Sequence, residues 1–163
     1  MIPIKYHKYL LAHSADQKAH SGLSLWSHLQ GVHRILQEAK QPDYVCIAGL
    51  FHSVYGTRSF KPVTIDKSRR REVSALIGES AEALAFAFCE LPRPKLFEAA
   101  LRAKHTPPEI AAYVVGSNET QFYQDLLALE CANLQEQRVL HEFPSLARHA
   151  QSLGMLDAEG FCI

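Results

Sequence analysis

Two histidines in apolar surroundings are the residues of this chain best suited to chemistry. His28 lies in Ser27-His-Leu-Gln-Gly-Val32, and His52 lies in Ala48-Gly-Leu-Phe-His-Ser-Val-Tyr-Gly-Thr57. A buried imidazole left without a partner costs about 1–3 kcal/mol, so each ring needs a hydrogen-bond partner or a metal ion. The pattern therefore indicates either one shared polar centre or two core histidines that bond to neighbouring groups.

Glu130 is the third candidate, because it stands in an apolar row of a long helical segment. A carboxylate in such a row is seldom buried without a cation or a hydrogen-bond donor. Two neutral imidazoles and a carboxylate can hold a divalent metal ion and leave positions open for water and substrate. We predict His28, His52 and Glu130 as metal ligands, with Glu130 as ligand or base. The alternative for Glu130 is a salt bridge to an arginine.

A basic segment follows His52 closely and could bind phosphate. Residues 58–71 contain six Lys and Arg side chains against one Asp. Arginines at the start of a helix oppose the helix dipole, and a bound phosphate would relieve this repulsion. We predict Arg69, Arg70 and Arg71 as a phosphate clamp, and the alternative is a solvated basic loop. Three further residues are candidate ligand contacts, namely Tyr55, Thr57 and Asn133.

The elements that must position these residues are helices, since the apolar periodicity is helical nearly throughout. We expect helices at residues 6–17, 24–39, 43–55, 69–77, 80–90, 94–104, 118–136 and 144–152. Asn118-x-x-Gln121 indicates a capping box at the start of the seventh helix. The chain has no repeats and no linker, so we expect one all-α domain over residues 1–163.

The second and third expected helices place the two histidines. At 100° per residue, His28 and His33 fall on opposite edges of the apolar stripe of the second helix. An edge position allows a polar group to line a cavity that core residues cover. The segment 44–55 has no charged residue, which is typical of a helix at the centre of a fold.

Composition narrows the class of protein. The 163 residues contain 17 Lys and Arg and 17 Asp and Glu, so no overall charge draws the chain to nucleic acid or to an acidic membrane. Its four cysteines show no C-x-x-C pair, which indicates reduced, structural thiols and a cytoplasmic protein. No stretch approaches about 18 apolar residues, so we expect neither a membrane span nor a signal peptide.

Residues 20–136 resemble the HD superfamily of helical metal-dependent phosphohydrolases, and within it the hydrolase domain of the RelA/SpoT alarmone enzymes. Those enzymes have Ser-Gly before H-P-x-x-V-A-x-x-L, then A-x-x-L-H-D, and later L-A-D-x-x-x-N. The matching segments here are Ser21-Gly22 before His28-Leu-Gln-Gly-Val32-His-Arg-Ile-Leu36, then Ala48-Gly-Leu-Phe-His52-Ser53, and Leu129-Glu130-Cys-Ala-Asn133, which is one residue shorter. The resemblance implies an HD-like helical bundle.

This chain departs from the alarmone enzymes at the acidic positions. Their metal-binding aspartate matches Ser53, and their later acidic pair matches Gly56 and Thr57. A serine hydroxyl is a poor ligand for a divalent ion compared with a carboxylate. The segment 50–57 is also similar to the hallmark of an uncharacterised HD-like family in which serine is the ordinary residue. Ser53 and Glu130 are therefore the candidate catalytic residues of a changed site.

The resemblance implies a metal-dependent hydrolase-type protein that acts on a phosphorylated small molecule or nucleotide. The alternative is a catalytically silent HD-like module that binds a ligand or a partner protein. A third possibility is an iron-dependent oxygenase on the same scaffold, with His105 near a second iron. The sequence leaves the substrate, the metal and the oligomeric state open.

Overall fold

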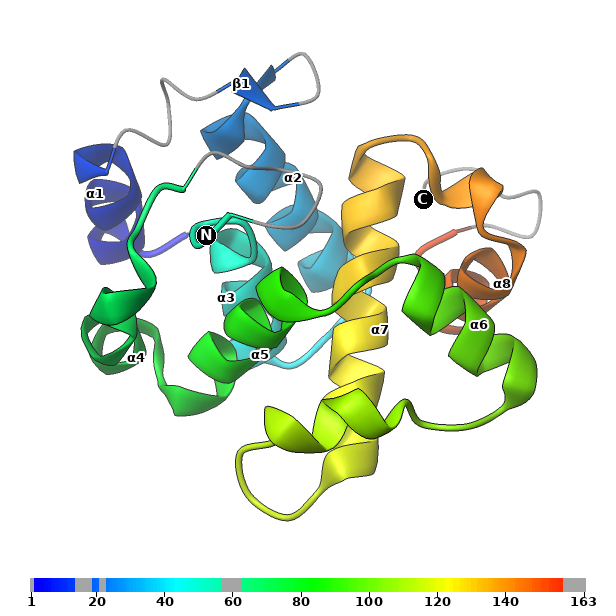
Figure 1. Ribbon diagram of the computed structural model, residues 1–163. Helices are drawn as coiled ribbons and strands as arrows, with labels where there is room; N and C mark the ends of the chain where they lie inside the picture. The colour runs from blue at the N-terminus through cyan, green and yellow to red at the C-terminus, as the bar shows by residue number, and fades with distance from the viewer. Residues whose placement is uncertain (1, 14–18, 21–22, 57–62, 157–163) are drawn as a thin grey trace.

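The computed structural model describes residues 2–13, 19–20, 23–56 and 63–156. They form an all-α, single-domain fold with one very short hairpin (Figure 1). Its α-helices are α1 (Ile4–Ala12), α2 (Leu25–Glu38), α3 (Asp43–Phe51), α4 (Arg70–Ile77), α5 (Glu79–Glu90), α6 (Lys95–Ala103), α7 (Glu119–Glu136) and α8 (Pro144–Ser152). The short 3-10 helices are η1 (Lys67–Arg69), η2 (Pro108–Ala112) and η3 (Leu140–Glu142). The all-α prediction is confirmed.

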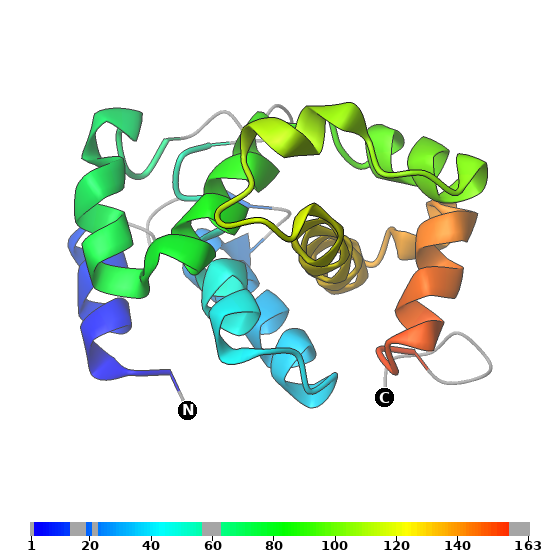
Figure 2. The same ribbon diagram turned by 90° about the horizontal axis from the view of Figure 1, so that it is seen from below.

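The long helix α7 runs through the middle of the molecule. Helices α2, α3 and α5 pack on one side of it, and α6 and α8 lie on the other side (Figures 1 and 2). Most residues of α7 are therefore buried, although its sequence has no strong apolar face. A helix surrounded by other helices must place its polar residues in the interior, and this creates the need for buried polar partners.

Local signals set the helix starts that position the candidate site. The Ser24 hydroxyl accepts a hydrogen bond from the Ser27 backbone N–H at 3.2 Å at the start of α2. Asn118 Oδ1 accepts one from the Gln121 N–H at 2.9 Å at the start of α7, as the capping pattern predicts. These bonds satisfy backbone donors that have no partner within the helix.

Two expected helices are too long. The first ends at Ala12 rather than residue 17, and the third ends at Phe51 rather than residue 55. Residues 52–55 form turns because the Val54 carbonyl accepts backbone bonds from Thr64 at 2.9 Å and Ile65 at 2.8 Å. This tertiary pairing competes with the helical bond pattern, so His52 caps α3 instead of lying within it.

The hairpin is the other difference from the sequence prediction, which contains no strand. Strands β1 (Ala19–His20) and β2 (Leu23–Ser24) pair antiparallel. Two residues are too few to produce a detectable alternation of apolar and polar side chains. The expected Ser21-Gly22 turn lies outside the described residues.

Helices α2, α3 and α7 pack closely against one another, and this packing holds the two histidines in place. Gly49 of α3 allows this approach, because an added Cβ would lie 2.5 Å from Leu36 Cδ1 and 3.3 Å from Val32 Cγ1. The apolar stripe of α2 is fully buried, as expected, through Leu25, Leu29, Val32 and Leu36. The described cysteines, Cys46, Cys89 and Cys131, are free and buried.

Candidate functional site

The structure brings His28 and His52 together in the core. His28 comes from the first turn of α2, and His52 caps the end of α3. Their Nε2 atoms are 3.0 Å apart, and the exposed fractions are 1% for His28 and 0% for His52. Two imidazoles that are 24 positions apart in the chain thus meet at one buried point.

The other ring nitrogen of each histidine is bound to an acceptor. His52 Nδ1 lies 2.7 Å from the Gly49 carbonyl oxygen, and His28 Nδ1 contacts a carboxylate oxygen of Glu136. A carbonyl oxygen can only accept, so His52 Nδ1 carries the proton and a neutral His52 has its lone pair on Nε2. The Glu136 carboxylate favours a proton on Nδ1 of His28 in the same way.

Two chemical states satisfy this geometry. In the first, His28 is an imidazolium that donates to both Glu136 and His52. In the second, both Nε2 lone pairs point at a shared metal ion, and the carbonyl and the carboxylate orient the rings from behind. Two nitrogen ligands about 2.05 Å from one metal lie about 2.9 Å apart at a right angle and about 3.3 Å apart at the tetrahedral angle. The observed 3.0 Å falls within that interval.

Glu136 is a site residue that sequence analysis missed. It is the last residue of α7, and its side chain is 14% exposed. Gly31, one turn after His28, makes room for it, since a Cβ there would lie 2.7 Å from Glu136 Cγ. A glycine inside an amphipathic helix is the only local signal of this close approach. It does not identify the partner, because Glu136 is 105 positions further along the chain.

Glu130 has a different partner from the one expected of a metal ligand. Arg93 Nη1 donates to both of its carboxylate oxygens, at 3.0 and 3.2 Å. Burial raises the pKa of the Glu130 carboxyl, and the Arg93 charge and bonds from Arg93 and Asn133 oppose that shift. Within the described residues, no group of three or more His, Cys, Asp or Glu could hold a metal ion. The two imidazoles fit a metal ion, and Glu130 does not fit as their third ligand.

The ring of Phe88 contacts both polar centres. Its edge-to-face contact with His52 has a centroid separation of 5.0 Å, and the Arg93 guanidinium carbon lies 3.5 Å from its centroid. Arg93 Nε also donates to the Phe88 carbonyl at 3.0 Å. Helix α7 therefore contributes one carboxylate to each centre, Glu136 to the histidines and Glu130 to the arginine.

The predicted ligand contacts do not gather at the histidines. Arg69 pairs with Glu72 at 2.7 Å, and Arg70 pairs with the buried Glu82 at 2.7 and 2.8 Å. Tyr55 is buried, and its hydroxyl donates to Glu82 at 3.0 Å. Two of the three arginines are therefore bound to carboxylates, and only Arg71 keeps an exposed side chain with no ion pair among the described residues.

The remaining candidates are placed as follows. Ser53 is buried directly after His52, and its carbonyl accepts from the Gly56 N–H at 3.1 Å. The Asn133 side chain is buried and accepts from Gln137 at 2.8 Å. Thr57 lies outside the described residues. His105 is exposed.

The fold and this centre define an all-α protein with a buried, acceptor-bound histidine pair. A family described as "Domain of unknown function (DUF6817)" matches residues 9–93, just over half of the chain, and the chain belongs to that family. The matched region contains both histidines and ends at Arg93, before α7. No curated protein and no solved structure matches the chain. In the described part of the chain, no helix combines the length and apolar character that a membrane crossing requires.

Proposed function

We propose that this protein has an HD-like architecture and binds one divalent metal ion through Nε2 of His28 and Nε2 of His52. The observation that carries the proposal is the 3.0 Å separation of these atoms, with each Nδ1 held by an acceptor. Acceptors on the outer nitrogens are the usual way in which proteins orient histidine ligands. The sequence resemblance is consistent with the same pair of ligands.

We further propose a hydrolase-type activity on a phosphorylated small molecule or nucleotide. A divalent ion bound there would acidify a coordinated water and polarise a phosphoryl oxygen. The chain's own residues would orient the ligands: Glu136 holds the His28 ring, and the Gly49 carbonyl holds the His52 ring. Ser53 is the buried neighbour of this pair and is the candidate for a direct contact to the reacting group.

A second candidate is a catalytically silent HD-like module that binds a ligand or partner without turnover. The Arg93–Glu130 ion pair favours it, because this carboxylate is already neutralised by a guanidinium and is not available as a base. The serine at position 53 favours it too, because a serine hydroxyl is a poorer ligand for a divalent ion than an aspartate carboxylate. Metal binding and turnover therefore need separate tests.

Metal binding is tested by elemental analysis of the purified protein and by titration of the metal-free protein with Co²⁺, whose visible spectrum reports nitrogen coordination. We expect one metal ion per chain in the unmodified protein and none in His28→Ala or His52→Ala. His105→Ala is the matched control, because this histidine is exposed, and it should keep the metal. A metal-free protein that gives no cobalt spectrum would overturn the proposal and leave the proton-sharing pair.

Turnover is tested by a screen of phosphate esters and nucleotides with added Zn²⁺, Mn²⁺ or Mg²⁺. Phosphate release that requires the metal and is lost in His52→Ala supports the hydrolase. Saturable binding without phosphate release supports the silent module. Circular dichroism of each variant shows whether a loss of activity comes from unfolding.

A further inference from the structure

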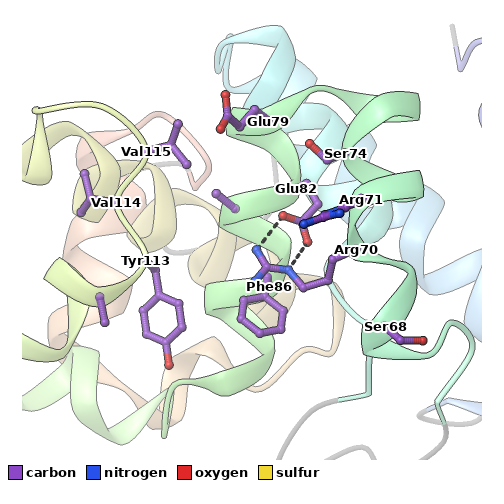
Figure 3. Close-up of a pocket in the computed structure, with 12 residues that line it drawn as sticks. Ser68, Arg70, Arg71, Ser74, Glu79, Glu82, Phe86, Tyr113, Val114 and Val115 are labelled. Carbon is purple, nitrogen blue, oxygen red and sulfur yellow. Dashed lines mark hydrogen bonds and ion pairs between the residues drawn. The ribbon is translucent and has the colours of Figure 1, made fainter.

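An open groove lies on the outer side of α5, away from the histidines. It has a volume of about 650 Å³ and lies between the start of α4, one face of α5 and residues 112–115 (Figure 3). Volumes of about 300–1,000 Å³ are typical of small-molecule sites. Phe86 lines this groove, whereas Phe88, two residues further along α5, contacts His52. Residues two positions apart on a helix point to nearly opposite sides, so the groove and the histidine centre are separate.

Arg70 forms a rigid wall of this groove. Its Nε and Nη2 atoms donate to the two carboxylate oxygens of Glu82, and its guanidinium carbon lies 3.5 Å from the Phe86 ring centroid. Glu82 is buried and also accepts from the Tyr55 hydroxyl at 3.0 Å. Because Glu82 and Phe86 hold the guanidinium plane in place, a ligand bound through Nη1 of Arg70 costs little further side-chain freedom.

Next to Arg70, the groove carries a second guanidinium and two hydroxyl-bearing residues. Arg71 lines it and has no ion pair among the described residues, while the charge of Arg70 is balanced by Glu82. Ser68 and Ser74 flank the two arginines, and the lining as a whole holds two arginines and two glutamates. In Figure 3 the remaining carboxylate, Glu79, lies at the opposite end of the groove from Ser68. An arginine fork with nearby hydroxyl groups is suited to phosphate oxygens.

The opposite wall is apolar and aromatic. Tyr113 lies beside Phe86, with ring centroids 6.1 Å apart, and Val114 and Val115 also line this wall (Figure 3). Val115 is 39% exposed, which leaves apolar surface for a ligand to cover. Flat aromatic ligands stack favourably on such rings and on guanidinium planes.

We propose that this groove binds a small molecule that combines a flat aromatic ring with a phosphate group. The ring lies against Tyr113 and Phe86, and the phosphate is held by Arg71 and by Nη1 of Arg70. The site is additional to the metal centre of the proposed function and does not depend on it. Binding at the groove therefore survives loss of either histidine.

The test uses adenosine 5′-monophosphate as probe, with adenosine and ribose 5-phosphate as its two halves. Calorimetry of the full chain measures affinity, and two-dimensional NMR locates the perturbed residues. Arg71→Ala should weaken binding of the monophosphate about tenfold, which is the size of a lost charge-assisted hydrogen bond, and should leave adenosine binding unchanged. Arg34→Ala is the matched control, because Arg34 is an exposed helical arginine with no ion pair among the described residues.

Tyr113→Leu keeps an apolar side chain and removes the ring, so it should weaken the binding of the monophosphate and of adenosine by a similar factor. His28→Ala should leave both affinities unchanged, which separates this site from the metal centre. NMR changes confined to the groove and its neighbours support the proposal. It is overturned if the monophosphate shows no saturable binding, if Arg71→Ala and Arg34→Ala bind it equally, or if His28→Ala abolishes binding.

Discussion

The histidine centre and the Arg93–Glu130 pair each take a carboxylate from α7, and both contact the ring of Phe88. In the pair, the guanidinium of Arg93 donates to both oxygens of Glu130, so a cation of the same chain balances the negative charge. At the histidines, the two Nε2 atoms lie 3.0 Å apart, so either a proton of one ring or a shared metal ion joins them.

The difference shows why a buried carboxylate alone does not identify a catalytic site. Glu130 has the burial and the position expected of a metal ligand, but a cation of the chain satisfies it. Glu136 is at the partly exposed end of the same helix and makes the contact that orients His28. The histidine centre, rather than the arginine pair, is the one whose nitrogen atoms are spaced as two ligands of one metal ion.

Breaking the ion pair should have the largest effect. Arg93→Met leaves the Glu130 charge buried without a cation, and we expect a loss of about 3–5 kcal/mol in the free energy of unfolding. The measurement is urea denaturation followed by circular dichroism. Arg93→Met with Glu130→Gln should recover much of the loss. If Arg93→Met costs less than about 1 kcal/mol, Glu130 is not held as a charged group by Arg93.

Removing the outer acceptor of His28 should act on metal binding more than on stability. Glu136→Gln keeps the shape of the side chain and removes the charge, and we expect metal affinity to fall about 10–100-fold. Competition with a chromophoric chelator measures the affinity. Glu142→Gln is the matched control, because Glu142 is an exposed carboxylate outside both centres. Equal affinities in the two variants would refute the orienting role of Glu136.

Filling the space beside Glu136 should also lower metal affinity, by less than the Glu136→Gln substitution does. In Gly31→Ala the new Cβ would meet Glu136 Cγ at 2.7 Å, so the carboxylate must move away from His28. Alanine is also the better helix former by about 1 kcal/mol, so stability should hold or rise while metal affinity falls. Thermal unfolding and the chelator assay on the same samples separate these effects. If thermal stability and metal affinity both fall, the substitution has distorted the backbone of α2 instead.

His33 is a buried histidine outside the histidine centre, and it can be compared with that centre. Its substitution should have the smallest effect, on the pH dependence of stability. It is buried on the other edge of α2, and its Nδ1 donates to the Cys46 carbonyl at 2.8 Å. Burial lowers the pKa of His33 below its ordinary value of 6.5, while the bond to Cys46 opposes the shift. The unfolded chain therefore takes up this proton first, and the contribution of His33 to stability, present above pH 6.5, is lost as the pH falls below it.

Urea denaturation between about pH 7.5 and about pH 5.5 measures this loss. His33→Gln keeps a donor for the Cys46 carbonyl and cannot be protonated, so its stability should fall less over that interval. Burial lowers the pKa of His149 as well, which adds a similar slope to both proteins. Identical slopes would show that His33 does not couple to unfolding.

The helical class, the order of the helices and the N-cap at Asn118 followed from the sequence, because they depend on periodicity and on contacts within one turn. The burial of both histidines followed too, because apolar neighbours surround them. The end of α3 did not follow, since a backbone pairing of Val54 with Thr64 and Ile65 stops that helix. Nor did the ion pair of Arg70 with Glu82, which joins two helices, whereas the pair of Arg69 with Glu72 is a local i,i+3 contact.

The sequence by itself therefore determined which side chains must be buried and which of them are polar. Only the tertiary structure decided the partners, because the relevant contacts join residues far apart: His28 with Glu136, Arg93 with Glu130, and Arg70 with Glu82. Burial forces a polar group to find a partner, and this requirement can be read from local pattern. Which partner it finds depends on how the helices pack around α7. No local sequence pattern shows which distant residues this packing brings together.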